Sequence, residues 1–205
     1  MLNSLQTIGL IRIISLFYYR FISLVFYLPR FRSCKSLTVQ SSPRLTGCRF
    51  ISIGTLSAGR LLRLEALWLF PKKPELTIGQ NVSFGDFCHV ACVLSLSISD
   101  NVLVGSNVYI TDHDHGNYSD SSEFSDPDVP PALRKLSARP VSIGSNVYIG
   151  ERSTILPGVS VGHGSVIGAG SVVTSDIPDF SVAAGVPCRV IKIYNFETCQ
   201  WINIT

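Results

Sequence analysis

The first 64 residues of this chain contain no acidic side chain, although they contain nine basic ones. Glu65 is the first acid, so all 14 aspartates and glutamates lie at or after that position. This one-sided distribution favours an anionic surface as the partner of the amino-terminal segment. The basic residues that precede Glu65 are Arg12, Arg20, Arg30, Arg32, Lys35, Arg44, Arg49, Arg60 and Arg63.

Paired redox or metal-binding cysteines are also missing, because no two of the six cysteines are spaced as CxxC. Cys88 and Cys92 are the nearest pair, and both suit a buried wall. Free thiols in a reducing cytoplasm are the simpler interpretation, and no metal is expected. The six are Cys34, Cys48, Cys88, Cys92, Cys188 and Cys199.

A long uncharged hydrophobic run is the third absence. Residues 8–28 are apolar and aromatic, but Arg12 and Arg20 interrupt them and Pro29 ends any helix. Two interior arginines make a spanning helix costly, and Arg20 splits the apolar core that a signal peptide needs. Residues 1–32 therefore predict an amphipathic helix. It either lies on the inner face of the cytoplasmic membrane or caps the end of the fold, and the sequence leaves both alternatives open.

What the chain does contain is a six-residue repeat. A strand alternates sides with period two, so a period of six indicates short strands joined by corners, with the aliphatic residue pointing inward. We therefore predict an all-β fold, a solenoid of stacked coils over residues 33–193, followed by a tail at residues 194–205. The repeating positions are Ile143, Ile149, Ile155, Val161, Ile167 and Val173.

The repeat extends upstream and is broken by one long segment. Residues 112–140 do not fit the pattern, begin Asp112-His113-Asp114-His115-Gly116, and contain four prolines. A long irregular loop between two regular blocks of coils favours a functional role. The upstream positions that keep the period are Ile78, Phe84, Val90, Ile98, Val104 and Ile110.

Several motifs are more specific than the repeat itself. They include Ile143-Gly-Ser-Asn-Val-Tyr-Ile-Gly, Ile155-Leu-Pro-Gly-Val and Ala183-Ala-Gly-Val-Pro-Cys-Arg-Val. These segments resemble the left-handed β-helix hexapeptide acyltransferases, especially the galactoside, maltose and nodulation-type O-acetyltransferases. The stretch that runs from His89 to Tyr118 is similar to the branch that acetylates sugars of O-antigen, colanic acid or capsule. The resemblance covers residues 50–193.

The resemblance implies a left-handed parallel β-helix that assembles as a homotrimer with active sites between subunits. It implies acetyl-CoA as the donor, a carbohydrate hydroxyl as the acceptor, and neither a metal nor an acyl-enzyme. The expected function is O-acetylation in surface-polysaccharide biosynthesis by a cytoplasmic protein, with no nucleic-acid partner. Peripheral contact with the membrane through residues 1–32 remains one alternative.

A sugar hydroxyl needs a base when it attacks a thioester, and histidine suits this task because its ordinary pKa is about 6.5. Counted without gaps from the Asp100-Asn101-Val102 coil, His115 falls on the catalytic histidine of the family, so we expect His115 to be the base. His113 is the second candidate. Asp112 and Asp114 could either orient an imidazole or bind sugar hydroxyls. The remaining candidates for the acceptor cleft are Asp112, Asp114, His89, Asp86 and Tyr118.

Acetyl-CoA is expected along the coils that follow the loop. Small residues there would let the pantetheine arm approach the backbone, and two basic residues would meet its phosphates. Glycines at these positions also have a complete structural explanation as solenoid corners. By resemblance, the cofactor residues are Tyr148, Gly150, Gly168, Ala169, Thr174, Arg189 and Lys192.

Three other functions remain open on sequence grounds. The acceptor could instead be an antibiotic, serine or a free sugar, because these acetyltransferases share the fold and donor. A β-helical zinc hydratase needs three converging histidines, and the spacing of His113 and His115 does not fit that pattern. A non-catalytic sugar-binding solenoid has no need for two histidines at the mouth of a loop.

Overall fold

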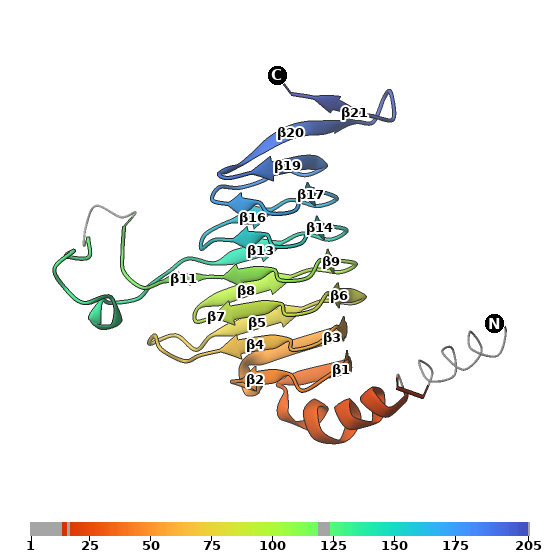
Figure 1. The fold of residues 1–205 in the computed structure, drawn as a ribbon, viewed down its shortest axis with the longest axis vertical. Helices are drawn as coiled ribbons and strands as arrows, with labels where there is room; N and C mark the ends of the chain where they lie inside the picture. Colours follow the sequence, from red (N-terminus) through yellow and green to blue (C-terminus); the bar gives the residue numbers. More distant parts are fainter. Residues whose placement is uncertain (1–13, 16, 119–123, 205) are drawn as a thin grey trace, which may run out of the picture.

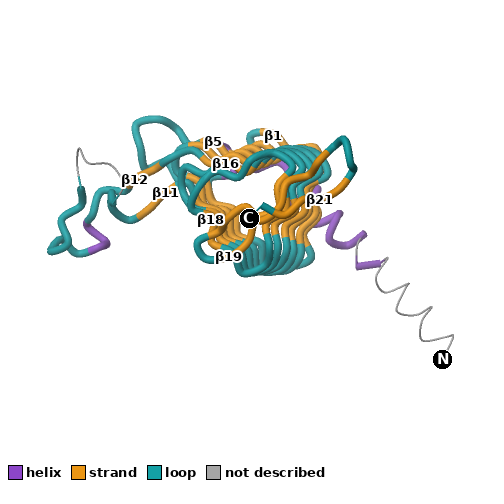
Figure 2. The backbone as a smooth tube through the Cα atoms, turned by 90° about the horizontal axis from the view of Figure 1, so that it is seen from above, coloured by secondary structure: helices purple, strands orange, loops and turns teal. Residues whose placement is uncertain are grey.

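The computed structural model describes residues 14–15, 17–118 and 124–204. The chain winds into a stack of coils, with the amino-terminal helix at the bottom and the carboxyl terminus at the top (Figure 1). Seen from above, successive coils superimpose, and the loop and the amino-terminal helix leave the stack on opposite sides (Figure 2). The predicted solenoid is therefore present as stacked coils.

Most described strands belong to a 13-stranded sheet that covers two faces of the stack. It does so because β3 spans a corner, pairing with β5 through its first half and with β6 through its second. The strands are β1 (Ser33–Val39), β3 (Ile51–Ala58), β5 (Glu75–Ile78), β6 (Val82–Phe84), β8 (Ser95–Ile98), β9 (Leu103–Val104), β13 (Val141–Ile143), β14 (Tyr148–Ile149), β16 (Ser160–Val161), β17 (Val166–Ile167), β19 (Ser181–Gly185), β20 (Cys188–Asn195) and β21 (Gln200–Asn203).

A six-stranded parallel sheet forms the third face. Its register repeats from coil to coil, so that Ile110 of β10 lies beside Val90 below and Ile155 above. Residues at the same position of the six-residue repeat thus lie above one another in successive coils. The strands are β2 (Arg44–Thr46), β4 (Arg63–Ala66), β7 (His89–Cys92), β10 (Tyr109–Thr111), β15 (Thr154–Ile155) and β18 (Val172–Val173).

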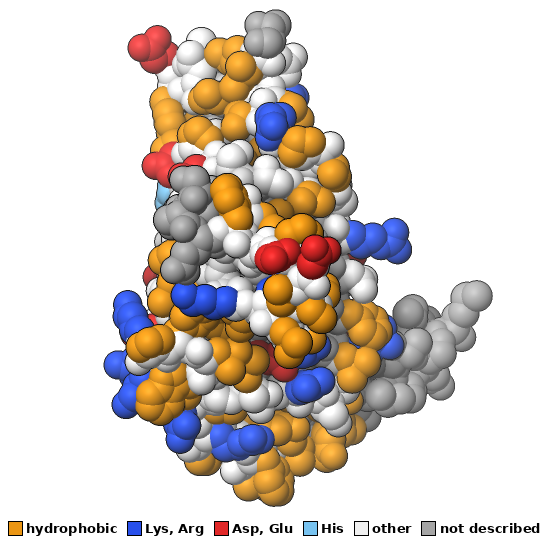
Figure 3. Space-filling model, turned by 90° about the vertical axis from the view of Figure 1, so that its left-hand side faces the viewer, with side chains coloured by type: hydrophobic (Ala, Val, Ile, Leu, Met, Phe, Trp, Pro, Cys, Tyr) orange, Lys and Arg blue, Asp and Glu red, His pale blue; other side chains and the backbone are white. Residues whose placement is uncertain are grey.

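Near the amino terminus, the helix joins the stack by its last turns. Residues 14–15 and 17–22 are helical and continue into η1 (Ser23–Tyr27) and η2 (Leu28–Arg30). Tyr27 and Leu28 pack against the core, whereas Phe17 and Phe21 are 71% and 61% exposed. From the side of the loop, hydrophobic, Lys and Arg side chains lie together over the lower coils (Figure 3).

The predicted helix at residues 1–32 is only partly visible, because residues 1–13 and 16 lie outside the described part. Within the described residues, no helix is both long and apolar enough to cross a membrane.

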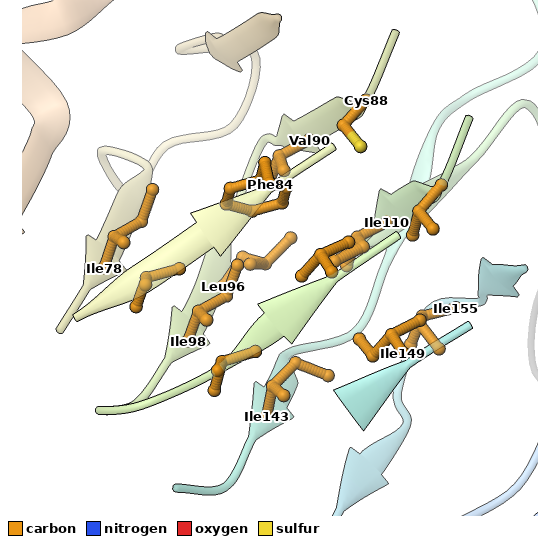
Figure 4. Packing of buried hydrophobic residues seen from close by; sticks show 14 of the residues in the cluster. Ile78, Phe84, Cys88, Val90, Leu96, Ile98, Ile110, Ile143, Ile149 and Ile155 are labelled. Atoms are coloured by element: carbon orange, nitrogen blue, oxygen red, sulfur yellow. The ribbon is translucent and has the colours of Figure 1, made fainter. Parts of the chain in front are cut away.

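The core is a column of aliphatic side chains inside the coils (Figure 4). Ile143, Ile149 and Ile155 occupy consecutive repeat positions and are at most 1% exposed. Burying one such side chain contributes about 1.5–3 kcal/mol. At the corners, Asn101, Asn107 and Asn146 adopt a left-handed backbone with φ between 58 and 60°, which asparagine tolerates better than most residues. The inward aliphatic and the corner residue together account for the repeat.

One corner requires glycine for lack of space. A Cβ on Gly150 would lie 2.5 Å from the backbone nitrogen of Ala169 in the next coil. A Cβ on Gly168 would lie 2.8 Å from the Cβ of Ala184. These two glycines therefore let neighbouring coils approach each other, and this structural role does not depend on cofactor binding.

The predicted insertion at residues 112–140 leaves the stack at mid-height (Figure 1). Its base is a short antiparallel pair, β11 (His113–Asp114) with β12 (Ser137–Ala138). The described part of its tip includes η4 (Pro131–Leu133), and η3 (Cys48–Phe50) precedes β3 lower in the stack. Asp120 and Glu123 lie outside the described residues.

The carboxyl-terminal segment has regular structure. Strands β19, β20 and β21 pair antiparallel and cover the top of the stack. The region that the sequence treats as a tail, residues 194–205, thus includes the end of β20 and all of β21.

Candidate functional site

His113 lies where the chain leaves β10 for the loop. Its Nδ1 is 3.1 Å from Oδ1 of Asp112 and 3.1 Å from Oγ1 of Thr111. Its side chain is 12% exposed, so part of it reaches solvent while Nδ1 is held by the protein. His113 is therefore fixed in orientation and accessible.

Asp112 is fully buried, with 0% exposure. Its Oδ2 accepts hydrogen bonds from the backbone N–H groups of Leu94 and Ser95 at 2.8 and 2.9 Å. Its Oδ1 accepts one from the N–H of Val93 at 2.9 Å. Burial alone would raise the pKa of Asp112, but the hydrogen bonds from His113, Leu94 and Val93 outweigh it and lower that pKa. Asp112 is consequently ionised at neutral pH.

An ionised carboxylate can only accept hydrogen bonds, so the ring N–H of a neutral His113 belongs on Nδ1, facing Asp112. That tautomer leaves a lone pair on Nε2, the nitrogen that a general base uses. Of the two roles open to Asp112, orienting the imidazole fits the geometry. Contact with an acceptor does not, because the side chain has no exposed surface.

His115 has a different environment. Its side chain is exposed, and its backbone carbonyl accepts a 2.7 Å hydrogen bond from the hydroxyl of Tyr118. Arg134 donates to the same hydroxyl at 2.8 Å, which ties both ends of the loop together. The rings of His113 and His115 are 6.5 Å apart, so the two histidines form one group. Tyr118 holds the loop here rather than pointing freely into a cleft.

His89 of β7 lies one coil below, in register with Tyr109 of β10, four residues before His113. Its Nε2 is 3.1 Å from Oε2 of Glu65, and its ring is 4.9 Å from that of Tyr109. Burial lowers the pKa of His89, more than the hydrogen bond to Glu65 raises it. The imidazole is therefore neutral at physiological pH and partly exposed beside Tyr109.

The two remaining acidic candidates are not drawn into this group. Asp86 lies at the corner before β7 and accepts hydrogen bonds from Arg60 Nη2 at 2.6 Å and Nε at 2.9 Å. These bonds lower the pKa of Asp86. Asp114 follows His113 in β11, with Oδ2 3.9 Å from Nη2 of Arg139. Asp114 stays at the mouth of the loop, whereas Asp86 belongs to the opposite corner.

The predicted cofactor residues lie above the loop in two groups. Tyr148 of β14 and the corner residues Gly150, Gly168 and Ala169 line one edge of the coils. Thr174 follows β18 at the other edge. Because Ile110, Ile155 and Val173 are in register, Thr174 lies two coils above Thr111, which contacts His113. Thr174 and Thr111 thus lie at the same edge of this sheet.

Two basic residues predicted to meet phosphates lie near the top of the stack. Arg189 and Lys192 both belong to β20, and the exposed Arg189 donates from Nη1 to the carbonyl of Cys188 at 2.9 Å.

The six cysteines are all free. No group of three or more His, Cys, Asp or Glu side chains suited to a metal ion occurs in the described part of the chain.

Sequence reasoning missed Thr111, Arg63 and Glu65 as neighbours of the histidines. Arg63 Nη2 donates to Glu65 Oε2 at 2.7 Å, and Glu65 lies in register with Ala91 and Thr111. The available signal was the coil register, because Glu65 precedes Ala91 by one coil. Aligning the repeat between neighbouring coils would have placed Glu65 on the same face as Thr111.

Comparisons with known proteins agree with this fold. Residues 75–112 and 140–175, on either side of the loop, match the family described as hexapeptide repeat of succinyl-transferase. WbbJ of Escherichia coli K12, assigned as a lipopolysaccharide biosynthesis O-acetyl transferase, is 38% identical over 172 residues, covering 83% of this chain and 85% of that protein. Galactoside O-acetyltransferase of the same strain is 44% identical over 104 residues, or 49% of this chain and 45% of that protein.

Two solved structures are also similar. A maltose O-acetyltransferase from Clostridium difficile 630 is 31% identical with a TM-score of 0.52, covering 77% of this chain and 66% of that one. An N-acyltransferase from Bacillus cereus, AntD, has a TM-score of 0.63 at 20% identity and covers 82% of this chain and 87% of that one. The second likeness concerns the fold alone.

Proposed function

Because this chain belongs to the hexapeptide-repeat acetyltransferase family, we propose that it moves the acetyl group of acetyl-CoA to a sugar hydroxyl. The observation that carries this proposal is the pairing of His113 with the buried carboxylate of Asp112 at the mouth of the loop. The similarity to WbbJ supports an acceptor in lipopolysaccharide or another surface polysaccharide.

In the proposed reaction, His113 is the general base. Its Nε2 takes the proton of the sugar hydroxyl as the oxygen attacks the thioester carbonyl, and Asp112 stabilises the imidazolium that results. The tetrahedral intermediate then collapses, the C–S bond breaks, and the CoA sulfur leaves with the proton from His113. Such general-base help contributes about 10²–10⁴-fold in rate.

This assignment reverses the order that the sequence favours, in which His115 is the base. His113 has an orienting carboxylate, whereas the hydrogen bond from Tyr118 to His115 holds the backbone carbonyl and not the imidazole. We assign His115 and the exposed edge of His89 to contacts with the acceptor, and we leave Asp114, beside Arg139 at the mouth of the loop, outside them. The donor runs over Tyr148, Gly150, Gly168, Ala169 and Thr174, with its phosphates near Arg189 and Lys192.

The proposal includes left-handed coils and a homotrimer in which a neighbouring subunit completes the donor groove. It also places the exposed phenylalanines of the amino-terminal helix on the inner membrane surface, where its basic residues would meet anionic lipid. The described helix meets the stack only through its last turns, which supports a lipid contact for the rest.

Histidine replacements test the base. His113→Ala should lower kcat for acetyl transfer by about 10²–10⁴-fold, whereas His115→Ala should mainly raise KM for the acceptor. His163→Ala, far from the loop, is the matched control. Thiol release from acetyl-CoA with a panel of sugars is the assay. A fully active His113→Ala variant would refute His113 as the base, and failure of the wild type to bind CoA in calorimetry would refute the acetyltransferase assignment.

A further inference from the structure

A cluster of charged side chains covers the outer face of the six-stranded sheet below the loop. It comprises Arg44 of β2, Arg63 and Glu65 of β4, and His89 of β7. Glu65 is at its centre, with a side chain 7% exposed. Its Oε2 is 2.7 Å from Arg63 Nη2 and 3.1 Å from His89 Nε2, and its Oε1 is 3.5 Å from Arg44 Nε. We call these four residues the arginine cluster.

The arginine cluster has more positive than negative charge. Two guanidinium groups share one carboxylate, and His89 adds no charge at neutral pH because burial lowers its pKa. The Nε of Arg63 is buried and has no acceptor within the described residues. Arg63 is therefore short of negative partners, and it is held in place by Glu65 while 39% of its side chain remains exposed.

The position of the cluster relative to the base decides what it could bind. Glu65, Ala91 and Thr111 lie in register on neighbouring strands, and Thr111 contacts the His113 ring. Two strand spacings put Arg63 and Glu65 about 10 Å from the strand of Thr111, and Arg44, one strand further, about 15 Å from it. It lies on the amino-terminal side of the loop, whereas the proposed donor path runs on the carboxyl-terminal side. A ligand that reaches from His113 to the cluster is thus the acceptor, not acetyl-CoA.

We propose that Arg63 and Arg44 bind a phosphate group attached to the acceptor sugar. The acceptor is then a sugar phosphate or diphosphate, linked to a nucleoside or to a lipid, rather than a neutral free sugar. Guanidinium groups suit this task because their planar array of N–H donors matches phosphate oxygens. Glu65 and His89 are positioning residues that fix Arg63. The inference rests on the proposed function, since it uses the acceptor side of the same site.

Calorimetry with inorganic pyrophosphate tests the inference directly. The full chain is first saturated with CoA, so that the donor-phosphate residues are occupied. We expect one pyrophosphate per protomer, with affinity reduced about tenfold by Arg44→Gln and by Arg63→Gln. Arg32→Gln is the matched control, because Arg32 is similarly exposed and has one acidic partner, Glu75, at 3.1 Å. It should bind pyrophosphate like the wild type.

Equal binding by the wild type and all three variants, or no binding once CoA is present, would overturn the inference. Arg44 is 69% exposed, so its replacement keeps the test valid even if the Arg63 variant does not fold. Tighter binding of uridine diphosphate than of pyrophosphate supports a nucleotide-linked acceptor, and tighter binding of geranyl diphosphate supports a lipid-linked one. If CoA binds and transfer to neutral sugars depends on His113 while pyrophosphate does not bind, only this inference fails.

Discussion

Replacing Asp112 by asparagine would keep the His113 imidazole but change which of its nitrogens carries the proton. The carboxylate accepts from three backbone N–H groups and faces Nδ1 of His113. An asparagine has one oxygen and one amide NH₂. Its oxygen is needed by the backbone donors, so the NH₂ group turns towards the ring. His113 must then accept on Nδ1 and carry its proton on Nε2, which is the wrong tautomer for a base.

We therefore expect Asp112→Asn to lower kcat by about 10²–10⁴-fold, the whole benefit of general-base catalysis. Loss of charge-assisted hydrogen bonds should also reduce the free energy of unfolding by about 1–3 kcal/mol. The pKa of Asp112 is lowered in the folded state, so its contribution to stability is present above the unfolded pKa and is lost as pH falls through the folded one. Acid sensitivity should accordingly be weaker in the variant.

Initial rates of thiol release from acetyl-CoA, together with urea unfolding at pH 7.5 and at about pH 3, below the unfolded pKa of about 3.9, measure both effects. Asp114→Asn is the control, because Asp114 is the neighbouring loop carboxylate and is 41% exposed. It should keep kcat within about threefold, as removing an exposed carboxylate costs little. A folded Asp112→Asn enzyme with wild-type kcat would refute the orienting role. So would an equal loss in Asp114→Asn.

Three further predictions concern the corner, the pH dependence and the helix. Gly150→Ala should destabilise the protein by about 1–3 kcal/mol in urea unfolding, because the new Cβ would meet the Ala169 nitrogen at 2.5 Å; an unchanged midpoint would contradict the close contact between coils. The pKa of His89 is lowered in the folded state, so its contribution to stability is complete above the unfolded value of about 6.5 and is lost as pH falls through the folded value. Thermal unfolding between pH 7.5 and 5.5 should thus show a smaller loss for His89→Gln than for the wild type, and parallel curves would count against this reasoning. A Phe17→Ser and Phe21→Ser double variant should sediment less with vesicles of anionic phospholipid, whereas Phe124→Ser, 62% exposed on the loop, should behave as the wild type; equal sedimentation of both variants would argue against a membrane contact by the helix.

The stacked coils could be predicted from the sequence because the inward side chains recur at fixed spacing. Ile143, Ile149 and Ile155 occupy the predicted inner positions and are buried. The place of the loop could be predicted for the same reason, since the repeat stops at Asp112. What periodicity misses is the carboxyl-terminal hairpin, because β20 and β21 alternate with period two and pair antiparallel.

The candidate site was harder to predict than the fold. An aspartate at the start of a polar loop gives no sign of burial, and the donors that bury Asp112 are backbone groups 17–19 residues earlier. Backbone N–H groups have no sequence signature. Counting positions favours His115, whereas our proposal of His113 depends on those contacts, so the sequence could not supply its grounds. The Glu65 contacts likewise depend on register between coils.

The bonds from Val93, Leu94 and Ser95 to Asp112 join one coil to the start of the next. The imidazole of His113, our proposed base, is therefore held by Asp112 in the observed orientation only while these two coils are packed together. Local fraying between them would switch off catalysis before the stack as a whole unfolds. In denaturant titrations, activity should consequently report the melting of this single junction, and stabilising the corner at residues 93–95 should extend the working range of the enzyme.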